Sequence, residues 1–119
     1  MKTILFILLC FISTPVFADE WTSADSYREA AYLVVDAVDW VQTRNIARNP
    51  IYHHENNPIL GRHPSVKQVD KYFAFEAIAN FGIAYVLPKD WRAGLQYVSI
   101  GVEIDCVSHN HKLGISSKF

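Results

Sequence analysis

The feature that most constrains the fold is a short polar stretch between two long apolar-rich segments. Residues 53–64 read HHENNPILGRHP and hold three of the five histidines, two of the five prolines and one of the five glycines. Proline cannot continue a helical hydrogen-bond ladder, and glycine adopts backbone conformations that other residues avoid. The stretch therefore predicts a structured loop that joins two helices of a small helical domain.

The segment before this loop carries a helical pattern. Thr22 followed three residues later by Asp25 is typical of a capping box at a helix start. From there to about residue 47, apolar residues recur at steps of three and four. Pro50 then ends the pattern. We expect one long helix here.

Polar side chains share one edge of this expected helix, at steps of four and three. We interpret this edge as a solvated acidic face. Asp36 is the residue that argues against this, because apolar residues flank it on both sides, and a buried carboxylate needs a partner or a raised pKa. The edge consists of Asp25, Glu29, Tyr32, Asp36, Asp39 and Thr43.

The segment after the loop predicts a second helix. Ser65 and Gln68 form another capping-box pattern, and the helical pattern runs from there to about Leu87. Its apolar second half contains only Glu76 and Asn80 as strongly polar residues. Because these two are four apart, they are neighbours on one helix face, and we treat both as candidates for buried polar groups.

Residues 91–109 carry two conflicting periods. Apolar and polar residues alternate over 98–106, as in a strand, whereas Gly94 and Gly101 lie two helical turns apart, where small residues allow close helix packing. We favour a helix, because a lone strand has no partner except the tail at 112–119, which also alternates. A short C-terminal β-hairpin is the alternative.

The first eighteen residues have the layout of a secretory signal. A positive start at Lys2, an apolar run over 4–12 and small or modest side chains at the −3 and −1 positions (Val16 and Ala18) predict cleavage after Ala18. The apolar run is too short to span a bilayer as a mature helix. We expect an exported protein, periplasmic or membrane-associated, whose residues 19–119 form a single domain.

The composition of the exported part further limits the classes of function that the protein can have. It has 10 basic and 12 acidic residues and no basic run, so nucleic acid is not an expected partner. Its one cysteine, Cys106, excludes an intramolecular disulfide. No G-x-S-x-G motif and no glycine-rich phosphate loop is present, so we expect a protein without enzymatic activity and without a cofactor.

Two interpretations of the polar residues remain open. A bundle that brings carboxylates and imidazoles together could bind a divalent metal, and the candidate ligands are then His53, His54, Glu55 and His63, with His109 and His111 in addition. Alternatively, the loop is purely structural. In that case Glu55 and Asn57 bond to backbone groups, while Pro58 and Gly61 fix the turn. We favour the structural interpretation.

The motif Glu55-x-Asn57-Pro58-Ile59-Leu60-Gly61, preceded by Asp36 and Thr43 on the first helix, resembles a group of uncharacterised short proteins. These are exported or membrane-associated bacterial or phage-borne proteins with an E-x-N-P-(I/L)-L-G loop between apolar helices. The likeness covers about residues 33–65. It implies three helices and membrane association, and it says nothing about a substrate. Asp39, Glu76 and the signal-like start depart from the membrane-embedded members.

These observations together predict a mainly α-helical bundle of about three helices with a central structured loop. We expect a partner-binding or membrane-associated module, because half of the residues are hydrophobic and 13% are aromatic. Another envelope protein or self-association would cover the excess apolar surface. One alternative is an integral membrane protein with buried polar residues, for which the candidates are Asp36, Glu76, Asn80 and Glu103. The other is a metal-binding periplasmic protein that uses the loop.

Overall fold

The computed structural model describes residues 19–119, which form three α-helices and no strand. The helices are α2 (Ser23–Arg48), α3 (Val66–Val86) and α4 (Lys89–Lys112). The predicted mainly helical fold is confirmed. Residues 95–107 belong to α4, so the C-terminal β-hairpin does not form. The expected signal segment, residues 1–18, lies outside the described residues.

Two of the three helices begin as the sequence predicts. The Thr22 hydroxyl accepts a hydrogen bond from the backbone N–H of Asp25, and the Asp25 carboxylate accepts one from the backbone N–H of Thr22. Ser65 and Gln68 form the same reciprocal pair at the start of α3. These contacts satisfy backbone donors that a helix start leaves free, and they fix where α2 and α3 begin.

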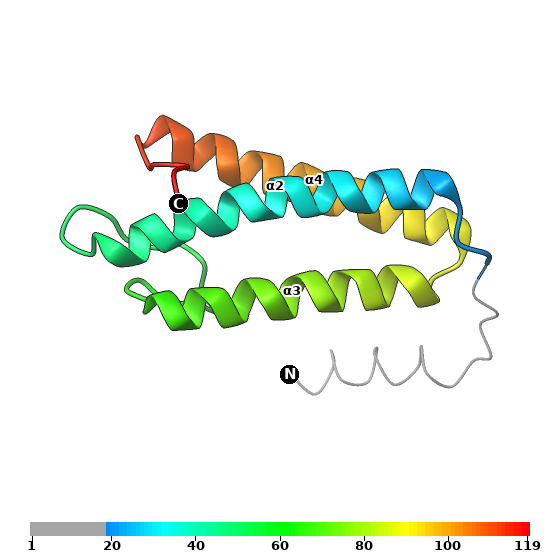
Figure 1. Ribbon diagram of the computed structural model, residues 1–119, viewed down its shortest axis with the longest axis horizontal. Helices are drawn as coiled ribbons and strands as arrows, with labels where there is room; N and C mark the ends of the chain where they lie inside the picture. Colours follow the sequence, from blue (N-terminus) through cyan, green and yellow to red (C-terminus); the bar gives the residue numbers. More distant parts are fainter. Residues whose placement is uncertain (1–18) are drawn as a thin grey trace.

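α2 is the central element of the bundle. It packs against α4 and against α3, whereas α3 and α4 contact each other less. α3 runs antiparallel to the other two helices (Figure 1). The loop at 49–65, the start of α3 and the end of α4 therefore gather at one end of the molecule, which we call the loop end.

The interior of the bundle is largely polar. Among residues 19–119, only six hydrophobic side chains are buried, against ten polar or charged ones. The interpretation of the α2 edge as a solvated acidic face is wrong, since all six of its residues are buried: Asp25, Glu29, Tyr32, Asp36, Asp39 and Thr43. Polar groups on α4 supply hydrogen bonds to Asp25, Glu29 and Asp39, so the polar edge of α2 faces inward while its apolar stripe faces outward.

The loop is held by its own polar groups. The backbone N–H of Glu55 donates to the carbonyl of Arg62 over 2.9 Å, and the N–H of Gly61 donates to the carbonyl of Asn57 over 3.0 Å. The Glu55 carboxylate accepts from the backbone N–H of Asn57, whose side-chain oxygen accepts from that of Ile59. Gly61 has a φ of 77°, which favours glycine. The backbone groups with which Glu55 and Asn57 bond belong to the loop itself, and the structural interpretation of the loop stays a prediction.

Candidate functional site

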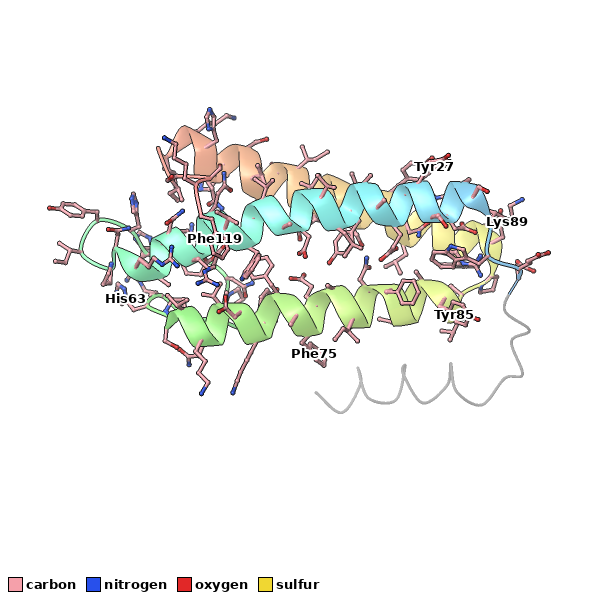
Figure 2. The ribbon with its side chains drawn as sticks, viewed as in Figure 1. Tyr27, His63, Phe75, Tyr85, Lys89 and Phe119 are labelled. Carbon is pink, nitrogen blue, oxygen red and sulfur yellow. The ribbon has the colours of Figure 1, made fainter. Side chains whose placement is uncertain are left out.

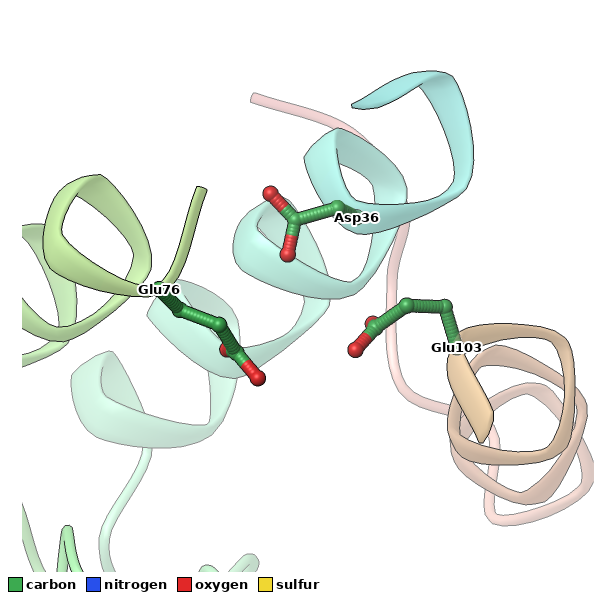
Figure 3. Close-up of side chains that lie close together, drawn as sticks. All are labelled: Asp36, Glu76 and Glu103. Carbon is green, nitrogen blue, oxygen red and sulfur yellow. The ribbon is translucent and has the colours of Figure 1, made fainter. Parts of the chain in front are cut away.

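Three carboxylates, one from each helix, meet in the middle of the bundle. Asp36 of α2, Glu76 of α3 and Glu103 of α4 each place an oxygen within 4.8 Å of the other two. Figure 3 shows the three side chains pointing toward one another. Asp36 and Glu103 are each 5% exposed, and Glu76 is half-buried. We call these three residues the carboxylate cluster.

In the part of the chain that the structure describes, no basic side chain pairs with this cluster. Within residues 19–119, the ion pairs join Arg28 and Arg92 to Asp25, and Arg44 to Asp70. Asp36 Oδ1 and Glu103 Oε2 are buried and have no hydrogen-bond partner. Buried polar atoms in folded proteins are almost always paired. Further exceptions in residues 19–119 are Glu29 Oε1, Gln42 Oε1, Arg44 Nε and Asn80 Nδ2, which also have no partner.

Burial sets the protonation of the cluster. Burial, together with the nearby charges of Glu76 and Asp39, raises the pKa of Asp36 from 3.8 to about 7. Burial and the charges of Asp39, Glu76 and Asp36 raise the pKa of Glu103 from 4.5 to about 8. Burial also raises the pKa of Glu76, although a hydrogen bond from Tyr72 opposes this effect. At neutral pH the cluster therefore retains part of its protons.

Asp39 extends the cluster toward the loop end. It lies three residues after Asp36, and its Oδ1 accepts a hydrogen bond from Asn110 Nδ2 over 2.9 Å. Burial and the charge of Glu55 raise the pKa of Asp39 to about 6. Asp39 also borders an open cavity of about 400 Å³, whose walls include His54, Glu55, Asn57 and His109. This cavity connects the buried polar interior with the loop.

The predicted loop ligands are not brought together as a metal site. Within the described part of the chain, the carboxylate cluster is the one group of three or more His, Cys, Asp or Glu residues whose donor atoms converge. His54 and Glu55 line the large cavity, His53 lines a separate hollow beside Asn45, and His63 is exposed. Metal binding by these four residues stays a prediction.

A second polar network lies at the opposite end of the bundle, where α4 begins. Arg92 and Asp25 are both fully buried and pair over 2.9 Å. One turn along α4, the Gln96 side chain donates to Glu29 over 2.9 Å and to the carbonyl of Asp25 over 3.1 Å. This network fixes the start of α4 against the start of α2. Because Asp36 follows Asp25 by the same number of residues as Glu103 follows Arg92, the same register brings Glu103 opposite Asp36.

The sequence analysis did not place Arg92 opposite Asp25 or Gln96 opposite Glu29. The sequence contains a pattern that could have revealed this pairing. Polar residues of α4 recur at steps of four, three and four, at Arg92, Gln96, Ser99 and Glu103. Asp25, Glu29, Tyr32 and Asp36 follow the same steps on α2. Two polar edges with one period predict that the helices face each other through polar residues. The other buried polar candidate, Asn80, accepts a hydrogen bond from Ser99 over 3.0 Å.

The outward faces of all three helices are apolar. Residues 30–43 of α2, 72–86 of α3 and 91–104 of α4 contain five charged residues, four of which are buried and one half-buried. We call the outward surface of these ranges the apolar exterior. Figure 2 shows Phe75, one of its members, pointing away from the bundle. Its large exposed side chains are Leu33, Val34, Phe75, Ile78, Phe81, Ile83, Tyr85, Val86, Trp91, Tyr97, Val98, Val102 and Ile104.

Comparison with known proteins identifies no relative. No family model, curated protein or solved structure matches the chain. Of the helices in residues 19–119, none has both the length and the apolar character that crossing a bilayer requires.

Proposed function

We propose that this protein is a small exported helical module, without enzymatic activity, that associates with a membrane through its apolar exterior. The observation that carries the proposal is the reversed polarity of the bundle, with a polar interior and apolar outward faces on all three helices. Removing a large apolar side chain from water contributes roughly 1.5–3 kcal/mol when burial is complete. Contact with acyl chains would therefore stabilise binding substantially.

Lipid fits this surface better than a single protein partner does. A partner of ordinary size covers one face, whereas exposed apolar residues lie on α2, α3 and α4 alike. Trp91 and Tyr85 lie near the end of the bundle opposite the loop, where Trp21 stacks on Tyr85 with 6.1 Å between ring centroids. Tryptophan and tyrosine are enriched at membrane–water interfaces.

The distribution of the basic residues also supports contact with a membrane. Seven of the ten lysines and arginines after residue 18 lie at the loop end, in and around the loop, the start of α3 and the tail. They are Arg44, Arg48, Arg62, Lys67, Lys71, Lys112 and Lys118. Basic residues beside an apolar surface are attracted to anionic lipid headgroups. The loop end is therefore expected to lie at the headgroups.

Cell fractionation tests the proposal. The full chain with a C-terminal tag would be expressed in a Gram-negative host, and the intact mass and location of the product determined. We expect a product beginning at Asp19 that stays with carbonate-washed membranes and floats with liposomes after purification. A mature product released entirely by osmotic shock and unable to float with liposomes would overturn membrane association. An uncleaved cytoplasmic product would overturn export.

A matched pair of variants separates the apolar exterior from hydrophobicity in general. Ile78→Lys with Val98→Lys changes two exposed residues of the apolar exterior, and Ile51→Lys with Ile59→Lys changes two even more exposed residues of the loop. We expect the first variant to lose liposome flotation and the second to keep it. Equal loss in both, or a stable soluble oligomer that ignores lipid, would contradict the proposal and favour self-association.

A further inference from the structure

We propose that the carboxylate cluster of Asp36, Glu76 and Glu103 is a binding site for one divalent cation of the hard, oxygen-preferring kind, such as Mn²⁺, Mg²⁺ or Ca²⁺. This site differs from the loop site that the histidine pattern suggests, because it contains no histidine and lies inside the bundle. It is also independent of the proposed membrane association.

The geometry matches the first coordination shell of such an ion. Three carboxylate oxygens from three helices converge within 4.8 Å of one another. Oxygen ligands lie 2.3–2.6 Å from Ca²⁺ and 2.0–2.1 Å from Mg²⁺, so two ligands of one ion are at most about 5 Å apart for Ca²⁺ and about 4 Å apart for Mg²⁺. Small rotations of the side chains would complete the site without moving the helices. Water would fill the remaining positions.

Two unpaired atoms indicate that this site lacks a component. Asp36 Oδ1 and Glu103 Oε2 accept no hydrogen bond, although both side chains are more than nine-tenths buried and point into the cluster. An acidic cluster alone would not require a ligand, since protons could neutralise it. A cation bound among the three carboxylates would supply a partner to such unsatisfied acceptors.

The charge balance and the donor type narrow the choice of ion. No lysine or arginine pairs with the cluster in residues 19–119, so the three carboxylates carry up to three uncompensated negative charges. A divalent ion neutralises most of this charge. Carboxylate donors without thiolate or imidazole suit Mg²⁺, Ca²⁺ and Mn²⁺ better than Zn²⁺ or Cu²⁺. Glu76, being half-buried, is the member through which an ion can enter.

Titration with Mn²⁺ tests the site directly. The purified exported protein in mild detergent, stripped with chelator, would be titrated while free Mn²⁺ is followed by electron paramagnetic resonance. We expect one Mn²⁺ per chain, displaced by Mg²⁺ or Ca²⁺, and at least tenfold weaker binding in Glu103→Gln and Asp36→Asn. Asp105→Asn is the matched control, because Asp105 is an exposed carboxylate one half-turn from Glu103 on α4, and it should bind as the unchanged protein does.

Thermal unfolding supplies a second readout that distinguishes a cation from shared protons. With a cation site, Mn²⁺ raises the unfolding midpoint of the unchanged protein and of Asp105→Asn, and leaves that of Glu103→Gln where it was. Absence of stoichiometric Mn²⁺ binding by the unchanged protein, or equal binding in Glu103→Gln, would overturn the proposal. In that case neutralisation by protons alone would explain the cluster. The unchanged protein decides this, even if one variant fails to fold.

Discussion

Replacing Arg92 by methionine should destabilise the fold more than any other single arginine substitution. The Arg92 side chain is fully buried, and each of its five N–H donors has an acceptor. Removing one partner of a buried ion pair costs about 3–5 kcal/mol, since the other charge stays behind without compensation. The acceptors that would lose their donor are the carbonyls of Asp19, Glu20, Ala84 and Leu87 and the carboxylate of Asp25.

The expected loss lies toward the lower end of this range, at about 3 kcal/mol. Asp25 keeps its hydrogen bonds from Thr22 and its ion pair with Arg28. A change of this size lowers the unfolding midpoint of a domain of about 100 residues by roughly 15 °C. It would be measured by circular dichroism during thermal and urea unfolding in mild detergent.

The control for this experiment is Arg48→Met, which removes the same group from an exposed position in the last turn of α2. It should change the free energy of unfolding by less than about 1 kcal/mol. If Arg92→Met also cost less than 1 kcal/mol, the buried network would not hold the ends of the bundle together, and the reasoning would be refuted.

Three further predictions concern the pH dependence of stability, two glycines and the cap of α3. In metal-free buffer the free energy of unfolding should fall as the pH rises from about 5 to 8. The pKa values of Asp36 (about 7) and Glu103 (about 8) are raised in the folded state, which therefore holds protons that the unfolded state releases. Urea titration of Asp36→Asn should show a shallower fall. Gly61→Ala should lower the free energy of unfolding by about 1 kcal/mol, since the backbone φ of Gly61 is 77°. Gly101→Ala lies in α4 with open space around it and should raise the free energy of unfolding by up to about 1 kcal/mol. Thermal melts that rank the two variants equally would contradict this. Ser65→Ala should cost about 1 kcal/mol by loss of the cap of α3, and an unchanged melt would show that the cap is dispensable.

The helices could be predicted from the sequence because their signals are local. Capping residues such as Thr22 and Ser65 act within one turn, and a proline cannot continue the hydrogen-bond ladder of a helix interior, so α2 ends before Pro50. The choice between helix and strand for residues 95–107 was harder, because alternation and helical spacing coexist there. It was decided by tertiary partners, since Gln96 and Glu103 face the polar edge of α2.

The candidate site could be predicted only in part. Asp36, Glu76 and Glu103 were recognisable as carboxylates in apolar surroundings, but their convergence depends on how the helices rotate about their own axes. The sequence pattern of α2 contains both an apolar and a polar edge, and the usual assumption that apolar residues face inward selects the wrong one. Matching the polar edge of α2 to that of α4 was the step needed to place Arg92 and Gln96.

The polar interior also changes which positions tolerate substitution. In an ordinary domain the apolar core is the intolerant part, and variation accumulates on the surface. Here the buried hydrogen bonds are directional, so interior positions such as Gln96 and Glu29 accept few replacements. Outward positions such as Val98 and Ile104 need only remain apolar. Sequences that share this fold should therefore keep their hydrophilic residues unchanged and exchange their hydrophobic ones freely, which is the reverse of the pattern by which distant relatives are normally recognised.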